Sequence, residues 1–196
     1  MFRWILLVVF VTTLGISGYF RAKARREGGT IGRGEETPFL IVMRLAFTLP
    51  LFLSILAYLI NPAWMAWSSV AVPDGVRWIG VVLGLCVVPL AYWVLRTIGR
   101  NISETVLTKA THELVTTGPY RWVRHPLYTV GTLLLTAVSL LAANWFIGGM
   151  TVLVVALILG VVIPREEANL IEKFGDAYRA YRKQTGRLLP RLLPSR

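Results

Sequence analysis

Residues 127–163 read LYTVGTLLLTAVSLLAANWFIGGMTVLVVALILGVVI and contain no charged side chain. A helix that crosses the hydrocarbon core of a bilayer needs about 20 mostly apolar residues, with a range of roughly 17 to 25. The stretch is long enough for two crossings, and Ala143-Asn144-Trp145 near its middle leaves room only for a tight turn. It therefore predicts two antiparallel membrane helices, at about residues 127–143 and 145–163.

Three more apolar segments lie upstream, at about residues 4–20, 39–60 and 76–95. Only 16% of the 196 residues are charged, whereas a soluble domain is typically about 25% charged. Backbone polar groups inside a bilayer must bond within their own segment, so each segment is predicted to be a helix. We therefore predict an all-α integral membrane protein with five transmembrane helices, forming a single membrane domain over residues 1–196.

The basic residues predict how these helices are oriented. Of the 21 Lys and Arg residues, 18 follow the first, third or fifth apolar segment, and only Arg3 and Arg77 lie near the opposite side. Because Lys and Arg collect in cytoplasmic loops, the N-terminus is predicted outside and the C-terminus in the cytoplasm. The net charge of +11 is explained by this bias and by contact with anionic membrane lipids, so we expect no nucleic-acid partner. The first segment is expected to be a retained anchor, because its basic residues follow the apolar core, whereas those of a signal peptide precede it.

The segment 164–196 is predicted to begin with an amphipathic helix at the cytoplasmic membrane surface. Pro164 suits the first turn of a helix, and Gly175-Asp176 is a weak point within it. Four apolar or aromatic residues recur at helical spacing on one face: Leu170, Phe174, Tyr178 and Tyr181.

Two polar clusters flank the predicted hairpin at the same membrane face. Arg124 and His125 precede its first helix, and Glu166 and Glu167 follow its second. The tight outer turn places the inner ends of the two helices side by side, so the four side chains are expected to share a pocket. Such a pocket suits a zwitterion or a positively charged cofactor. The alternative is that the basic residues bind lipid phosphate and the glutamates only stabilise a helix start.

Several familiar site types find no support. The single cysteine, Cys86, lies within an apolar segment, and His112 and His125 lack the spacing of paired ligands, so no metal site is expected. Neither a phosphate-binding loop nor a Gly-x-Gly-x-x-Gly turn is present.

Residues from about Arg100 to Pro190 resemble the isoprenylcysteine carboxyl methyltransferase family, which is related to the phospholipid methyltransferases. The motifs that carry the resemblance are Thr111-His112-Glu113-Leu114-Val115-Thr116, Gly118-Pro119-Tyr120, Arg124-His125-Pro126-Leu127-Tyr128, Glu166-Glu167-Ala168-Asn169-Leu170, Phe174-Gly175-Asp176-Ala177-Tyr178 and Gly186-Arg187-Leu188-Leu189-Pro190. The resemblance implies that S-adenosylmethionine lies in a cytoplasmic pocket between the last two membrane helices and the C-terminal segment, and that a lipophilic substrate enters from the bilayer. The chain departs from the family at Val162, where an arginine often precedes the glutamate pair.

Roles follow from this resemblance as hypotheses. Arg124 and Glu166 are predicted to be catalytic, with Arg124 positioning a carboxylate. The aromatic faces of Tyr120 and Tyr128 suit a sulfonium cation. The residues predicted to bind the cofactor are His112, Leu114, Val115, Gly118, Tyr120, His125, Tyr128 and Glu167.

Three functions remain open from the sequence. The first is O-methylation of the carboxylate of an isoprenylated cysteine or a similar lipophilic substrate, which is ionised at neutral pH and needs no general base. The second is methylation of a phospholipid amine or a small thiol by a protein of the same build. The third is a non-enzymatic membrane carrier or scaffold, which the near absence of charge inside the segments makes the weakest.

Overall fold

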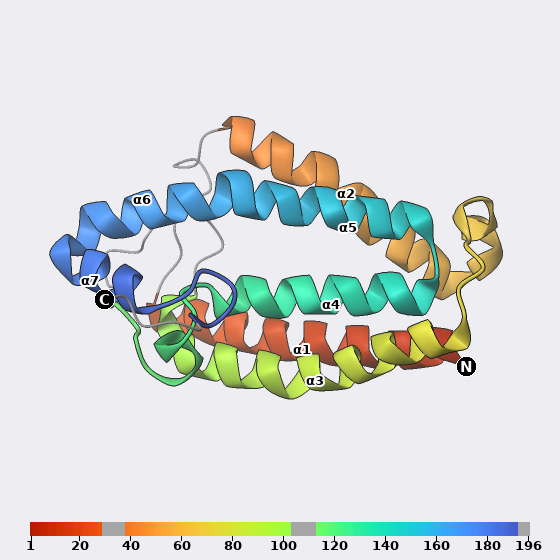
Figure 1. Ribbon diagram of the computed structural model, residues 1–196, viewed down its shortest axis with the longest axis horizontal. Helices are drawn as coiled ribbons and strands as arrows, with labels where there is room; N and C mark the ends of the chain where they lie inside the picture. The colour runs from red at the N-terminus through yellow and green to blue at the C-terminus, as the bar shows by residue number, and fades with distance from the viewer. Residues whose placement is uncertain (29–37, 103–112, 192–196) are drawn as a thin grey trace.

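The computed structural model describes residues 1–28, 38–102 and 113–191. Long helices lie lengthwise in a bundle (Figure 1). They are α1 (Phe2–Gly28), α2 (Pro38–Ile60), α3 (Asp74–Ile98), α4 (Pro126–Ala142) and α5 (Trp145–Leu157), which continues through the π-helical turn η5 (Ile158–Val162) into α6 (Ile163–Phe174). Shorter helices are η2 (Pro62–Ser68), η3 (Gly99–Asn101), η4 (Gly118–Arg121) and α7 (Asp176–Gln184). The described ranges contain no strand, only two isolated β-bridges.

Within the described ranges, four helical stretches are long and apolar enough to cross a membrane: Phe2–Glu27, Ile41–Ile60, Asp74–Ile98 and Trp145–Phe174. The apolar helix α4 is shorter, at 17 residues. These helices make the chain an all-α, multi-pass integral membrane protein, as predicted. A fifth crossing by α4 and the cellular orientation of the termini stay predictions.

The core is built around α3, which packs against both α1 and α4, and these two helices also contact each other. A Cβ atom added at Gly80 would lie 3.0 Å from the Leu140 Cβ atom, and one at Gly84 would lie 3.2 Å from the Val9 side chain. Gly80 therefore permits close approach of α4 to α3, and Gly84 permits close approach of α1.

The turn between α4 and α5 confirms the predicted hairpin. Ala143 adopts a left-handed conformation (φ 48°), and the Asn144 side chain caps α5 by accepting a hydrogen bond from the backbone N–H of Ile147 at 3.1 Å. The Asn144 amide also donates to the Met65 carbonyl at 3.1 Å and to the Ser68 hydroxyl at 2.8 Å. Because Asn144 is buried, these bonds fix the hairpin to η2.

The predicted boundary at Pro164 is wrong in one respect, because no separate helix starts there. The chain stays helical from α5 to Phe174 and breaks only at Gly175, which adopts a positive φ of 55°. A proline inside an α-helix clashes with the carbonyl four residues earlier. The π-helical turn lies immediately before Pro164 and hydrogen-bonds Ile163 N–H to the Ile158 carbonyl, so the helix passes the proline in an altered register.

The two ends of the bundle differ in content. The N-terminus lies at one end with η2 and the α4–α5 turn, whereas η4, α7 and the described C-terminal residues gather at the other (Figure 1). The described parts of the loops that we predicted to be cytoplasmic therefore share one end of the molecule.

Candidate functional site

The site begins where the C-terminal residues 185–191, here called the closing segment, pair with the chain before α4. Arg124 N–H donates to the Gly186 carbonyl at 2.8 Å, and His125 N–H donates to the Arg187 carbonyl at 3.1 Å. A Cβ atom at Gly186 would lie 1.7 Å from the Leu189 carbonyl oxygen, so only glycine fits this fold of the segment. The Thr129 hydroxyl adds a 2.7 Å bond to the Leu188 carbonyl. These contacts hold the closing segment across the start of α4.

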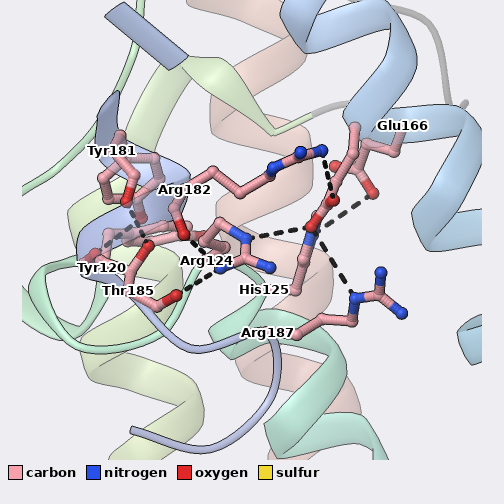
Figure 2. A network of polar contacts seen from close by, with 9 residues as sticks. Tyr120, Arg124, His125, Glu166, Tyr181, Arg182, Thr185 and Arg187 are labelled. Atoms are coloured by element: carbon pink, nitrogen blue, oxygen red, sulfur yellow. Dashed lines mark hydrogen bonds and ion pairs between the residues drawn. The ribbon is translucent and has the colours of Figure 1, made fainter. Parts of the chain in front are cut away.

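The Glu167 carboxylate lies at the centre of the site. Its side chain is 6% exposed and lies 3.0 Å from Arg124 Nε and 3.3 Å from His125 Nε2. Arg182 Nη1 and Arg187 Nε each lie 3.9 Å from one of its oxygens. Figure 2 shows the side chains of Arg124, Arg182 and Arg187 converging from different segments. A buried carboxylate needs such compensation, because desolvation penalises an isolated charge by several kcal/mol.

Arg124 joins the elements of the site to one another. Besides its bond to Glu167 on α6, its Nη1 atom donates to the backbone carbonyls of Arg182 on α7 and Thr185 at the start of the closing segment. The side chain is only 10% exposed. Its contacts are therefore those of a residue that holds α6, α7 and the closing segment together.

Glu166 has different surroundings from its neighbour. Its Oε2 atom lies 3.7 Å from His125 Nδ1, yet it is a buried atom with no hydrogen-bond partner in the described structure. The Tyr128 hydroxyl lies close enough to interact with this carboxylate, and the Tyr128 ring centroid lies 5.7 Å from that of His125. Glu166 thus has one oxygen available to a ligand, whereas Glu167 is surrounded by protein groups.

The structure brings together five of the predicted site residues: Arg124, His125, Tyr128, Glu166 and Glu167. The predicted proximity of the two polar clusters is therefore confirmed. The functional roles given to these residues stay predictions.

The other predicted residues lie in or before η4. Gly118 has a positive φ of 57°, and Val115 packs against the main core. Leu114 is half-buried, and Tyr120 is buried, with its backbone carbonyl accepting a 2.6 Å hydrogen bond from the Tyr181 hydroxyl. His112 lies outside the described residues.

Sequence reasoning did not assign Arg182, Thr185 or Arg187 to the site. The two arginines resembled ordinary cytoplasmic charges, and nothing local indicated that the closing segment folds back over α4. The available signal was the Gly186-Arg187 pair within the quoted C-terminal motif, because a glycine can mark a tight backbone approach.

The unpaired atoms of the site indicate that a polar ligand fits it. Among the described residues, four buried side-chain polar atoms lack a hydrogen-bond partner, and two of them, Glu166 Oε2 and the Tyr178 hydroxyl oxygen, belong to α6 and α7. One is an acceptor and the other a donor, as a ligand with both kinds of group requires. The described residues contain no cluster of three or more side chains suited to a metal ion.

Residues 79–172, which include α4, α5 and the glutamate pair, match the family model described as the isoprenylcysteine carboxyl methyltransferase (ICMT) family. This part of the chain belongs to that family. The ICMT match covers Arg124, His125, Glu166 and Glu167, but it ends before α7 and the closing segment.

Individual relatives agree with the ICMT assignment. Protein-S-isoprenylcysteine O-methyltransferase of Schizosaccharomyces pombe is 35% identical over 98 residues, which cover 49% of this chain and 41% of that protein. The rat protein of the same name is 31% identical over 112 residues, covering 56% of this chain and 38% of its own length. The chain thus matches about four-tenths of the length of these methyltransferases. The Bacillus subtilis protein YpbQ, named as uncharacterized, is 25% identical over 86% of this chain and 96% of its own length.

Proposed function

We propose that this protein is an S-adenosylmethionine-dependent membrane methyltransferase that O-methylates the carboxylate of an isoprenylated cysteine or a similar lipophilic substrate. The observation that carries the proposal is the convergence of Arg124, His125, Glu166 and Glu167 at one end of an apolar helix bundle, within the ICMT match. The named ICMT relatives support the same reaction.

The contacts favour roles for the two glutamates that differ from those predicted from sequence, in which Glu166 is catalytic and Glu167 binds the cofactor. Glu167 is occupied by Arg124, His125 and the two half-exposed arginines of the C-terminal region, so it holds the framework. Glu166 keeps an unpaired oxygen and accepts from the amino group or a hydroxyl of the methyl donor. His125, which touches both carboxylates, orients them relative to each other.

S-Adenosylmethionine, when bound, supplies a methyl group on a positively charged sulfur that is already an activated leaving group. The protein then has to align the acceptor oxygen with that methyl and exclude water. The aromatic ring of Tyr128 beside His125 suits the cationic sulfonium. A carboxylate acceptor is ionised at neutral pH and needs no proton removed, so alignment and charge placement are sufficient.

We propose that the lipophilic substrate reaches the site sideways from the bilayer, past α2. No described side chain of residues 38–50 is buried, whereas Leu51, Ile55 and Leu59 in the second half of α2 pack in the core. α2 crosses the α5–α6 rod at an angle, so its first half diverges from the bundle near the site (Figure 1). This arrangement supports lateral access at the face that we propose to be cytoplasmic.

A second candidate is methylation of a phospholipid amine or small thiol by the same site. The 3.7 Å approach of His125 Nδ1 to Glu166 Oε2 favours it, because a histidine beside a carboxylate can accept the proton that such an acceptor must lose.

The deciding experiment is transfer of a tritiated methyl group by the purified protein to three acceptors side by side: a prenylcysteine analogue, phosphatidylethanolamine and a small thiol. We expect label on the prenylcysteine, released as methanol by alkali because the product is an ester. Alkali-stable label on the amine or thiol would establish the second candidate. Absence of transfer to all three, from protein that melts cooperatively, would contradict both.

A further inference from the structure

Two buried tyrosines lie three positions apart on α7 and differ in one respect. The Tyr181 hydroxyl donates a 2.6 Å hydrogen bond to the Tyr120 carbonyl. The Tyr178 side chain is 1% exposed, yet its hydroxyl has no hydrogen-bond partner in the described structure. Their ring centroids lie 5.9 Å apart. The two neighbouring tyrosines therefore differ in that one hydroxyl is hydrogen-bonded and the other is not.

An unpaired buried hydroxyl needs an explanation. Native proteins pair the large majority of buried side-chain polar atoms, either internally or with ordered water. Burial, together with the charges of Glu167 and Glu166, raises the pKa of Tyr178, so the phenol keeps its proton at neutral pH. It is therefore a hydrogen-bond donor that requires an acceptor.

The groups around Tyr178 restrict what that acceptor can be. The groups that act electrostatically on its hydroxyl are Glu167, Arg124, Glu166 and Tyr181. Glu167 and Arg124 are engaged with each other and with further groups, whereas Glu166 Oε2 lacks a hydrogen bond. Two helices in contact, α7 and α6, thus contribute one unpaired buried donor and one unpaired buried acceptor. A neutral hydroxyl satisfies both, because it can accept one hydrogen bond and donate another. A carboxylate could accept from Tyr178 but has no hydrogen to donate to Glu166, so it would satisfy only one of the two.

We propose that Tyr178 and Glu166 together bind a ribose hydroxyl of the methyl donor, with Tyr178 donating to it and Glu166 accepting from it. This inference rests on the proposed function, because the ribose belongs to the nucleoside part of that donor. It assigns a ligand-binding residue to α7, which lies beyond the residues matched by the family model. An ordered water would offer the same pair of bonds and is the competing explanation.

The test measures affinity by titration calorimetry for S-adenosylhomocysteine and for its 2′-deoxy and 3′-deoxy analogues, and measures melting without ligand. The proteins are the wild type, Tyr178→Phe and the matched control Tyr181→Phe. For Tyr178→Phe we expect unchanged or higher apo stability and roughly tenfold weaker binding of S-adenosylhomocysteine. One deoxy analogue should bind the wild type and Tyr178→Phe equally, because it lacks the hydroxyl in question. Tyr181→Phe should melt at a lower temperature and keep the wild-type ratio between ligands.

Several outcomes would overturn the inference. Equal losses for S-adenosylhomocysteine and both analogues would mean that Tyr178 does not contact the ribose. Lower apo stability with unchanged affinity would assign the hydroxyl to a water. Should Tyr178→Phe fail to fold, the wild type decides, since equal binding of all three ligands would overturn the proposal. If the wild type binds none of them, the proposed function itself fails.

Discussion

At the scale of single residues, Glu166 and Glu167 are adjacent in sequence but turn to different partners. Glu167 is buried, and four side chains lie within 4 Å of its carboxylate: Arg124, His125, Arg182 and Arg187. Glu166 has an unpaired oxygen beside His125. Neighbours on a helix point about 100° apart, so one residue can face the protein framework while the next faces a ligand.

This difference predicts opposite phenotypes for two conservative variants. Glu167→Gln leaves the buried Arg124 guanidinium without its counter-charge and should lower the free energy of unfolding by about 3 kcal/mol. Glu166→Gln should change stability by less than about 1 kcal/mol but weaken binding of S-adenosylhomocysteine roughly tenfold. Chemical denaturation in detergent and titration calorimetry measure the two quantities. If Glu166→Gln proves to be the destabilised protein and Glu167→Gln the one with weak binding, our division of labour is wrong.

The residue scale also separates what was predictable from what was not. Arg124, His125 and the glutamates were predicted to meet because a tight outer turn forces the inner ends of two helices together. Arg182 and Arg187 were missed, because their partner is a carboxylate 15 and 20 positions away. It is reached only because the helix breaks at Gly175 and, for Arg187, because the closing segment folds tightly at Gly186. A basic residue near a membrane face has a sufficient explanation in topology alone, so its charge gives no indication of such a partner.

At the scale of elements, the closing segment is the part that completes the site. It forms a short parallel pairing with residues 123–125, and Gly186 is its tightest point. By contrast, a Cβ atom added at Gly148 on α5 would meet nothing within 4 Å. The two glycines therefore offer a matched pair of substitutions.

Gly186→Ala should prevent the closing segment from seating on Arg124 and His125, because the new methyl group would overlap the Leu189 carbonyl. We expect faster proteolysis of the C-terminal residues and at least a tenfold loss of affinity for S-adenosylhomocysteine, since Arg124 would lose carbonyl partners that hold it. Limited proteolysis with mass spectrometry and calorimetry report the two effects. Gly148→Ala should match the wild type in both. If Gly186→Ala is digested at the wild-type rate, the closing segment can seat with a different backbone conformation and the prediction is wrong.

Elements also show why one boundary was misplaced. Proline is favoured in the first turn of a helix, so Pro164 after an apolar run predicts that a new helix begins there. The π-helical turn at 158–162 accommodates the proline instead, and nothing in the apolar run Ile-Leu-Gly-Val-Val indicated a change of hydrogen-bond register. The helix ends at Gly175, where the sequence did indicate a weak point and where a positive φ favours glycine.

At the scale of the whole molecule, the arginines at the end opposite the site pair with backbone carbonyls of the fold. Arg3 donates from Nε and Nη2 to the Leu59 and Ile60 carbonyls at 2.9 and 2.7 Å, which caps α2. Arg77 donates to the Leu141 carbonyl at 2.7 Å near the end of α4, with its guanidinium 4.1 Å from the Phe2 ring centroid. Both side chains donate to carbonyls near the C-terminal ends of helices, which have no partner within the helix. Arg3 and Arg77 are thus engaged in structural contacts. The basic residues that remain to bias the topology lie mainly at the end that carries the site.

This asymmetry predicts the orientation of the molecule in the membrane. After Cys86→Ser, single cysteines introduced by Asp74→Cys at the start of α3 and Lys183→Cys on α7 should react differently with a membrane-impermeant maleimide, because both positions are exposed but lie at opposite ends of the bundle. We expect Asp74→Cys to be labelled in intact cells and Lys183→Cys to be labelled only after permeabilisation, as measured by a gel shift. The Cys86→Ser parent is the control for background labelling. The reverse pattern would put the site outside the cytoplasm. Labelling of both positions in intact cells would mean that the chain crosses the membrane an even number of times between them. One of the helices between the two positions, most simply the short α4, would then not span the membrane.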